Sequence, residues 1–353
     1  MTRSALVLQG GGALGAFEFG AAQALYEQGL RPDVIAGVSI GAVTASLLAR
    51  PANGNPLSTL EAFWEQVTVP GVLLPPALRP YASFLGNPGF FRLRPEFFIW
   101  PGWLASPTWT HFYETQPLRD TLTELIDLDK LKQPDVDPVL FVSATNIEEG
   151  EIEYFNSRDG GLSLDHILAS GSLPPAFPKT EIDRKSYWDG GLFDNTPLGA
   201  VLDVLNTPPD PDRAVYVVNL FPNKGPVPNN LLGVFERMKN LQFANKTAED
   251  IKLLCRFNEV ALLMEALENL PVNPLVSDDA YRHVKRRGYI PVPRIVSITL
   301  PEPAPEFGDA DFSPEALGQR REQGRAQAIA ALKAAPLDPC LVLDKPKEKK
   351  RRR

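Results

Sequence analysis

The stretch that decides the fold is Pro32-Asp33-Val34-Ile35-Ala36-Gly37-Val38-Ser39-Ile40-Gly41-Ala42. Its β-branched run at 34–35 predicts a short strand, and the small residues of 42–49 predict a helix. Between them lies a G-x-S-x-G turn, which is typical of a nucleophile elbow, where a strained strand-to-helix turn exposes a serine hydroxyl. Gly37 and Gly41 allow this turn to be sharp. Ser39 is therefore a candidate nucleophile, and the helix after it would direct its positive dipole end toward an anion formed there.

A second glycine-rich turn precedes this one. Residues 4–9 are apolar and predict a buried strand, and they lead into Gly10-Gly11-Gly12-Ala13-Leu14-Gly15 and a helical pattern. The first fifty residues therefore predict a β-loop-α-β-turn-α start to a parallel α/β sheet. Parallel neighbouring strands would place this loop beside Ser39, where the N–H groups of Gly10, Gly11 and Gly12 could form an oxyanion hole.

The same loop also matches a dinucleotide-binding fingerprint. Gly10, Gly12 and Gly15 have the G-x-G-x-x-G spacing between a strand and a helix. Such a site needs an acidic residue at the end of the second strand to bind the ribose. The second predicted strand ends instead at the elbow, which argues against an NAD-binding protein but leaves that alternative open.

The rest of the chain alternates between strands and helices. Strands are expected at 139–146, 151–156, 185–188, 214–221 and 294–300, and helices at 58–69, 117–126, 164–170, from Thr196, within 230–270, at 277–288 and at 313–335. The acidic, proline-rich residues 301–311 suggest a linker. Residues 70–113 are rich in proline, glycine and aromatic residues, and they suggest either a surface excursion packed on the core or a lid or wall of an acyl-chain pocket.

Composition limits the classes of function. The chain has 353 residues, a net charge of −7, two cysteines and three histidines. Residues 345–353 contribute +6, so the body is acidic and a nucleic-acid enzyme is not expected. The cysteine and histidine spacings predict neither a disulfide framework nor a metal site, and no cofactor is expected. Because no signal peptide or membrane span is evident, the expected location is cytoplasmic.

A serine nucleophile needs a proton acceptor. His166 is expected to be packed, His111 lies in the aromatic stretch, and His283 lies among basic residues. A triad of Ser39, Asp189 and His283 can be written, but an α/β-hydrolase elbow would follow more strands than this one does. Asp189, in a Trp-Asp-Gly-Gly turn after a strand, is the better candidate, although such a turn on its own need have no function.

Four segments together resemble the patatin-like phospholipases. They are GGGALG (10–15), GVSIG (37–41), ASGSLPPAFP (169–178) and DGGLFDNTPL (189–198), in the order of that family. The resemblance implies a three-layer α/β fold with a mostly parallel sheet, and a serine–aspartate dyad in which Ser39 attacks and Asp189 takes its proton. It also implies hydrolysis of lipid acyl esters without a metal. The family motif glycines are matched by Gly15, Gly37, Gly41, Gly190 and Gly191.

One position departs from the family pattern. The family often carries a basic residue in the glycine-rich loop, where this chain has Leu14. The oxyanion would then be stabilised by backbone N–H groups and the helix dipole alone. A catalytically weak lipid-binding or scaffold protein on the same fold is therefore an alternative to an enzyme.

The expected organisation is an acyl hydrolase domain over 1–224 that includes the 70–113 insertion. A largely helical C-terminal extension would follow over 225–340, and a basic disordered tail over 341–353. Residues Lys345 to Arg353 could contact an anionic membrane surface transiently, which would make the protein peripheral to a membrane. The substrate's head group, its acyl length and the oligomeric state do not follow from the sequence.

Overall fold

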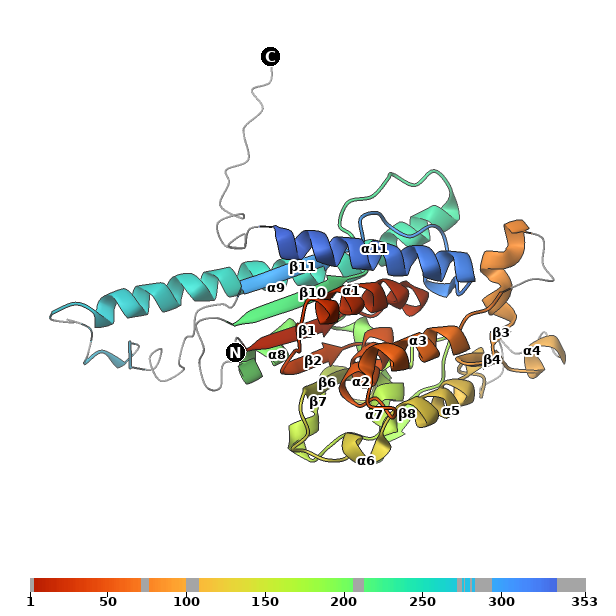
Figure 1. Cartoon of the computed structure of the whole chain (residues 1–353), viewed down its shortest axis with the longest axis horizontal. Coiled ribbons are helices and arrows are strands. Elements are labelled where there is room, and N and C mark those ends of the chain that lie inside the picture. Colours follow the sequence, from red (N-terminus) through yellow and green to blue (C-terminus); the bar gives the residue numbers. More distant parts are fainter. Residues whose placement is uncertain are drawn as a thin grey trace, which may run out of the picture.

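A computed structural model describes residues 3–70, 76–99, 108–205, 213–271, 275, 277–279, 281–282 and 294–334. Its centre is an eight-stranded sheet with the order β11-β10-β1-β2-β6-β9-β8, in which β7 also pairs with β6 (Figure 1). The strands are β1 (Ser4–Leu8), β2 (Val34–Gly37), β6 (Val139–Asn146), β7 (Glu151–Asn156), β8 (Thr180–Ile182), β9 (Lys185–Asp189), β10 (Ala214–Asn219) and β11 (Arg294–Thr299).

The five strands from β11 to β6 are parallel, whereas β7, β8 and β9 form antiparallel pairs. The α/β class and the mostly parallel sheet predicted from the sequence are confirmed. The predicted hairpin of 139–146 with 151–156 is present as β6 and β7, with Phe141 opposite Asn156.

Helices cover both faces of the sheet. They are α1 (Ala16–Glu27), α2 (Ile40–Ala49), α3 (Pro56–Gln66), α5 (Gln116–Leu125), α6 (Leu128–Leu131), α7 (Leu164–Ser170), α8 (Leu198–Leu205), α9 (Leu231–Glu268) and α11 (Pro314–Lys333). Short 3-10 turns are η1 (Gly12–Gly15), η4 (Ser157–Asp159), η5 (Gly190–Leu192) and η6 (Gly308–Ala310).

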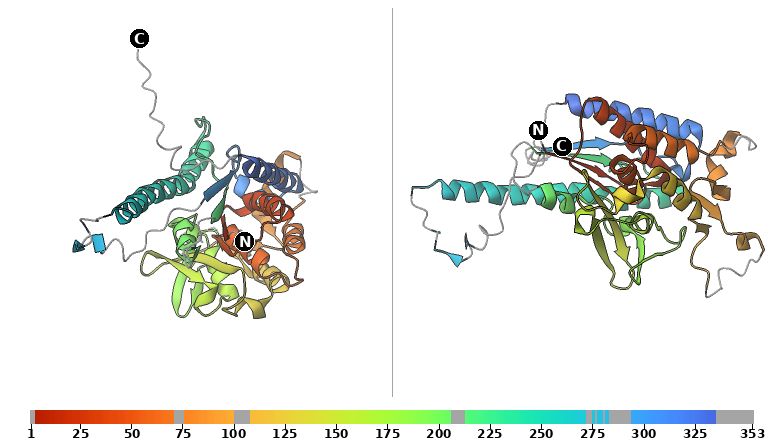
Figure 2. Two further views of the ribbon diagram at one scale, coloured as in Figure 1. Left: turned by 60° about the vertical axis from the view of Figure 1, so that its left-hand side comes forward. Right: turned by 60° about the horizontal axis from the view of Figure 1, so that its bottom comes forward.

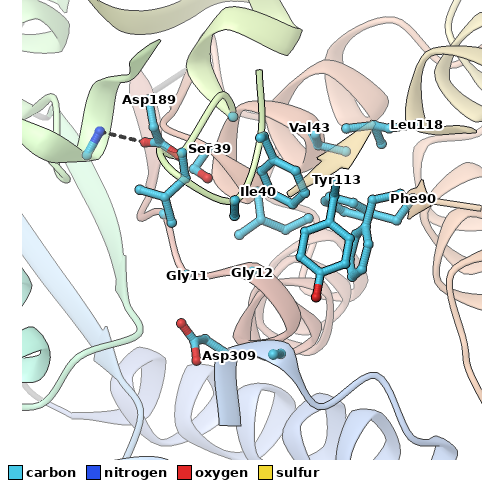
Figure 3. Close-up of a pocket in the computed structure, with 18 of the residues that line it drawn as sticks. Gly11, Gly12, Ser39, Ile40, Val43, Phe90, Tyr113, Leu118, Asp189 and Asp309 are labelled. Atoms are coloured by element: carbon cyan, nitrogen blue, oxygen red, sulfur yellow. Dashed lines mark hydrogen bonds between the residues drawn. The ribbon is translucent and has the colours of Figure 1, made fainter. Parts of the chain in front are cut away.

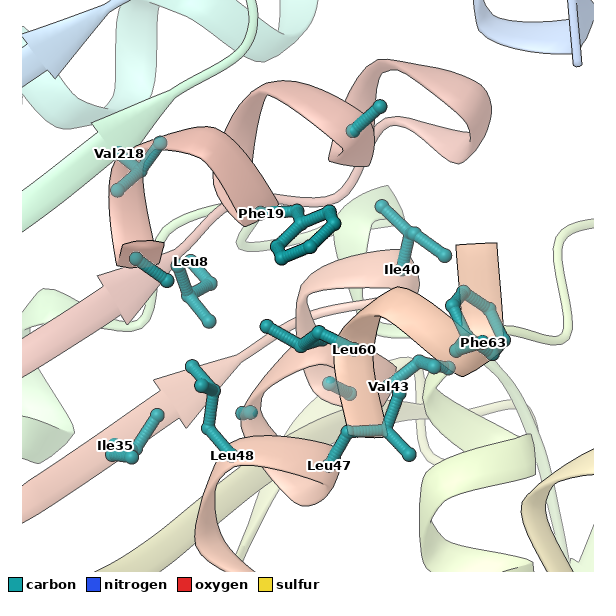
Figure 4. Close-up of a cluster of buried hydrophobic side chains, with 14 of the residues drawn as sticks. Leu8, Phe19, Ile35, Ile40, Val43, Leu47, Leu48, Leu60, Phe63 and Val218 are labelled. Atoms are coloured by element: carbon teal, nitrogen blue, oxygen red, sulfur yellow. The ribbon is translucent and has the colours of Figure 1, made fainter. Parts of the chain in front are cut away.

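The core is divided by the sheet because successive side chains of a strand point to opposite faces. On β1, Leu6 and Leu8 join the large cluster under α1, α2 and α3, which Figure 4 shows in part. Ala5 and Val7 join the second cluster, which α8 covers with Leu198, Val201, Leu202 and Leu205. The result is a three-layer arrangement of helices, sheet and helix.

The last helix packs tightly on the first. At the crossing of α1 and α11, a Cβ on Gly20 would lie 1.8 Å from the Arg321 carbonyl oxygen, and one on Gly324 would lie 1.9 Å from that of Phe17. Only glycine permits so close an approach of two helix backbones. β11 also pairs with β10 in the central sheet. The division of the chain at residue 224 stays a prediction. Two elements that follow residue 224 are nevertheless part of the central fold: β11 belongs to the sheet, and α11 packs on α1.

The described parts of the aromatic stretch form a small subdomain beside the sheet. It contains η2 (Pro76–Leu85), β3 (Gly86–Asn87), β4 (Phe91–Leu93), α4 (Glu96–Ile99) and β5 (Tyr113–Glu114), and the three strands form an antiparallel sheet. The long helix α9 runs past the end of the central sheet (Figures 1 and 2). Within the described ranges, no helix combines the length and apolarity needed to cross a membrane.

Candidate active site

The turn after β2 has the geometry of a nucleophile elbow. Ser39 has φ 55° and ψ −122°, and α2 begins at the next residue. Positive φ is uncommon for a residue with a Cβ and marks backbone strain, which concentrates at functional sites. A Cβ on Gly37 would lie 2.0 Å from the Gly41 carbonyl oxygen, and one on Gly41 would lie 2.5 Å from that of Leu8. Both motif positions therefore require glycine because the elbow is packed against itself and against β1.

Strand β6 brings Asp189 to this turn. The first part of β6 pairs with β2, whose last residue Gly37 is opposite Val142. β7 pairs with the opposite edge of β6. Beyond the end of β2, the edge that β2 shares with β6 is therefore taken by β9, and Asp189 is opposite Ala144. Two strands that enter from opposite directions thus end near one another on the same edge. Figure 3 shows the Asp189 carboxylate beside the Ser39 side chain, whose hydroxyl favours the charged form of the carboxylate.

The Asp189 carboxylate is buried and partly satisfied. Its side chain is 3% exposed, and Oδ1 accepts a hydrogen bond of 2.7 Å from the Gly191 N–H. Burial raises the pKa of Asp189 to about 6, while the hydrogen bonds with Ser39 and Gly191 oppose this shift. A carboxylate with a pKa near the working pH is suited to accept and return a proton.

The glycine-rich loop lies against the elbow, but its three N–H groups are not equivalent. A Cβ on Gly10 would lie 3.0 Å from the Ser39 Cβ. The Gly10 N–H donates to Asn195 Oδ1 at 3.0 Å, and Asn195 Nδ2 donates back to the Gly10 carbonyl at 3.2 Å. The prediction of three free donors is therefore corrected at Gly10, whose N–H already has an acceptor. In the part of the chain that the structure describes, the Gly11 and Gly12 N–H groups have none.

Gly12 has a conformation and surroundings that exclude a side chain. Its φ is +56°, and a Cβ would lie 2.4 Å from the Asp309 carbonyl oxygen. Residues 301–311 were expected to form a linker, but Asp309 and Ala310 instead line the cavity in front of this loop. That expectation is wrong because the segment packs on the glycine-rich loop rather than connecting two bodies.

Leu14 points into the core rather than toward the serine. It is buried in the main hydrophobic cluster. A guanidinium approaches the same loop from the last helix, because Arg320 Nη1 donates to the carbonyl oxygens of Ala13 at 3.3 Å and Asp311 at 2.8 Å. Nothing in the sequence signals this contact, which joins residues more than 300 positions apart.

Two further residues hold the site and were not identified from the sequence. Asn195 links the Asp189 turn to the glycine-rich loop through the bonds described above. Ser170, at the end of α7, accepts the Ser39 N–H at 3.0 Å on its Oγ. Both lie inside the quoted motifs 169–178 and 189–198, so the motifs contained the signal, although the contact partners could not be deduced.

An apolar cavity opens in front of Ser39 and Asp189. Its volume is about 220 Å³, and aromatic rings form much of its wall. The aromatic subdomain supplies Phe84, Phe90, Phe91 and Tyr113, and the centroids of the last two lie 4.8 Å apart. Other apolar lining residues are Ile40, Val43, Leu118, Ile167, Leu173, Phe177, Phe221, Phe243 and Phe312. Residues 70–113 were interpreted either as a surface excursion or as a lid or pocket wall. The described part of this stretch lines the cavity and so forms part of its wall.

The described histidines lie away from this cavity. His166 Nδ1 accepts the Ser163 N–H at 3.0 Å, and its ring packs on Phe155 at 4.6 Å. Burial lowers the pKa of His166. His111 pairs with Glu114 at 3.3 Å. His283 lies outside the described residues, so the triad alternative is not tested there. Across the described ranges, no three His, Cys, Asp or Glu side chains are grouped as metal ligands would be.

The chain is similar to known proteins over its first two hundred residues. The family described as patatin-like phospholipase matches residues 6–202. Lysophospholipase NTE1 from Saccharomyces cerevisiae is 28% identical over 196 residues, which cover 55% of this chain and 10% of that protein. Lysophospholipase NTE1 from Candida glabrata is 27% identical over 194 residues, which cover 55% of this chain and 9% of that protein. The chain thus corresponds to about a tenth of the length of these relatives.

A solved structure with a detectable likeness is VipD from Legionella pneumophila. Its sequence identity is 16% and its TM-score is 0.40, over 94% of this chain and 66% of that one. The family match is the stronger finding because it spans more than half of the chain and contains the elbow, the glycine-rich loop and the Asp189 turn. The chain therefore belongs to the patatin-like phospholipase family.

Proposed function

We propose that this protein is a serine acyl hydrolase that cleaves fatty acyl esters of lipids through Ser39 and Asp189. The observation that carries the proposal is the pairing of a strained serine with a buried aspartate at one end of an aromatic cavity. Membership of a phospholipase family supports a hydrolase that acts on lipids. The apolar wall favours an acyl chain as the group bound next to the serine.

The reaction would proceed in two steps. Ser39 Oγ attacks the ester carbonyl carbon while Asp189 takes its proton, and the carbonyl oxygen becomes an oxyanion. The N–H groups of Gly11 and Gly12 would stabilise it, together with the positive end of α2. Asp189 then returns the proton to the leaving alcohol as the ester bond breaks. In the second step water attacks the acyl-enzyme, Asp189 accepts a proton from the water, and Ser39 leaves with that proton as the fatty acid is released.

The test is turnover of p-nitrophenyl esters of increasing chain length by the full chain. Ser39→Ala and Asp189→Asn are each expected to lower turnover by more than about 100-fold. The matched control is Ser58→Ala, because Ser58 is an exposed serine outside the cavity, and it should retain wild-type activity. A fluorophosphonate probe should label the wild type and Ser58→Ala but not Ser39→Ala.

Three results would redirect the assignment. Absence of labelling and turnover in a folded wild type would favour the lipid-binding or scaffold alternative. That alternative is suggested by Leu14, which replaces a basic residue, and by the Gly10 N–H, which already has an acceptor. Thermal stabilisation by NAD without esterase activity would favour the dinucleotide alternative. An active Asp189→Asn with an inactive His283→Ala would favour the triad.

The basic tail is proposed to help the protein reach anionic lipid surfaces. Lys345 to Arg353 lie outside the described residues, so the proposal rests on their charge in the sequence. It predicts binding to anionic vesicles that weakens with salt. Equal binding by a chain that ends at Asp344 would contradict it.

A further inference from the structure

The first part of α9 presents an apolar stripe to solvent. Its members recur at the spacing of one helix face, i, i+3, i+4, i+7 and i+10. Leu231, Val234, Phe235, Met238 and Leu241 are 69%, 40%, 59%, 60% and 39% exposed. We refer to these five residues as the α9 stripe. Large apolar side chains grouped in this way mark a surface that another apolar body covers.

The polar residues of the same segment face the body of the protein. Arg237 Nη2 donates to the Asn223 carbonyl oxygen at 2.7 Å. Lys239 Nζ lies 2.9 Å from Asp309 Oδ2, and Asn240 is buried. This segment is therefore an amphipathic helix whose polar face contacts the protein and whose apolar face contacts solvent, the reverse of a helix packed on a core. The charged side chains on this face are half-buried against the protein, whereas the apolar face points outward.

The helix that carries the α9 stripe also lines the acyl cavity. Lys239 and Phe243, on the same turns of α9, line the cavity that contains Ser39 and Asp189. Asp309, the partner of Lys239, also lines the cavity and contacts the glycine-rich loop. The ion pair thus lies at the cavity, on the turns of α9 that also carry Met238 and Leu241 of the stripe.

We propose that the α9 stripe docks on a lipid bilayer, with its apolar side chains in the acyl region and the Lys239–Asp309 pair at the depth of the head groups. The proposal rests on the proposed lipid hydrolase function. A lipid surface is the occupant that fits, because an acyl chain leaving that surface beside α9 enters the cavity past Lys239 and Phe243. Interfacial helices insert an apolar face to a shallow depth in this way without spanning the bilayer.

Apolar docking differs from the tail interaction in its response to salt. Insertion of phenylalanine and methionine side chains is driven by removal of apolar surface from water. Attraction of a basic tail to anionic lipid is screened as the Debye length falls. Neutral vesicles at high salt therefore isolate the contribution of α9.

The test uses the full chain and sedimentation with phosphatidylcholine vesicles. Phe235→Ser/Met238→Ser removes the two central side chains of the stripe, and Phe235→Leu/Met238→Leu is the matched control that keeps both positions apolar. The serine pair should bind at least about tenfold more weakly, because two apolar side chains no longer insert. The leucine pair should bind as the wild type does, and raising salt to about 1 M should not weaken binding.

Three results would overturn docking on lipid. They are failure of the wild type to bind neutral vesicles, equal binding by the serine pair, and loss of binding in the leucine pair. A wild-type dimer in sedimentation velocity without lipid, converted to monomer by the serine pair, would assign the stripe to a second copy of the chain. Hydrolysis of soluble p-nitrophenyl butyrate separates this inference from the proposed function. That turnover should be unchanged in both pairs, and its absence from the wild type would refute the hydrolase whatever the vesicle result.

Discussion

Replacing Asp189 by asparagine is expected to stabilise the protein at alkaline pH while it abolishes ester turnover. Asp189 is 3% exposed, and burial raises the pKa of its carboxyl group from the ordinary value of 3.8 to about 6. At pH 8 the folded protein therefore holds an ionised carboxylate in buried surroundings, where its charge is less stable than it is in water. Asparagine removes that charge and can still accept the Gly191 N–H on its carbonyl oxygen.

The magnitude follows from the two pKa values. A carboxyl group whose folded pKa is raised contributes stability that is fully present below pH 3.8 and is lost as the pH rises to about 6. A difference of about two pKa units between the folded and unfolded states corresponds to about 3 kcal/mol. The asparagine variant should thus gain up to about 3 kcal/mol at pH 8 and about half as much at pH 5.

Urea unfolding of the full chain at pH 8 and pH 5 measures this gain. The matched control is Asp135→Asn, because Asp135 is exposed and does not line the cavity. It should change the free energy of unfolding by less than about 0.5 kcal/mol at both values. A less stable Asp189→Asn at pH 8, or a gain that does not depend on pH, would refute the argument that the ionised aspartate destabilises the fold.

Three shorter predictions concern the site, and a fourth concerns the packing of α11 on α1. Wild-type ester turnover should fall about tenfold for each pH unit below 6, as Asp189 becomes protonated, which a pH–rate profile measures. Asn195→Ala should lower kcat more than it changes KM, because Gly10 loses two buried hydrogen bonds, and steady-state kinetics would show unchanged constants if the clamp had no role. Ser39→Gly should be about 1 kcal/mol more stable than Ser39→Ala in urea, since φ at this position is 55°; equal stability would mean that the turn is not strained. Gly324→Val should lower Tm by several degrees, because its side chain would collide with the Phe17 carbonyl, and an unchanged Tm would contradict the close crossing.

The fold was largely predictable because its signals are local. The strands at 4–8, 34–37, 139–146 and 214–219 are runs of apolar residues, and buried parallel strands have that composition. Ser39 was identified because the elbow needs glycines at fixed positions on either side. The helical pattern within 230–270 also indicated α9, although its outward-facing stripe could not be anticipated because periodicity does not reveal which face a helix buries.

The site was predictable as a set of motifs but not as a set of contacts. Gly10 and Asn195 lie 185 residues apart, so only the folded chain shows that the asparagine occupies the Gly10 N–H. Arg320 beneath the glycine-rich loop depends in the same way on where α11 crosses the sheet. The composition of residues 301–311 is that of a solvated segment, and it therefore suggests a linker. The packing of Asp309 on Gly12 depends on the folded chain and cannot be deduced from composition.

The pairing of β2 and β9 along one edge of β6 positions the two reactive side chains. A different segment of the chain forms the cavity wall that would select the acyl chain. The distance between serine and aspartate is set by the register of a single strand, in which Val142 and Ala144 face the two strand ends. The aromatic wall at 76–114 is contributed by a segment that takes no part in this pairing. Phe90 and Phe91 of the wall also pack in the main hydrophobic cluster. Substitutions at wall positions outside that cluster, such as Phe84, could therefore redirect the same dyad toward different acyl chains.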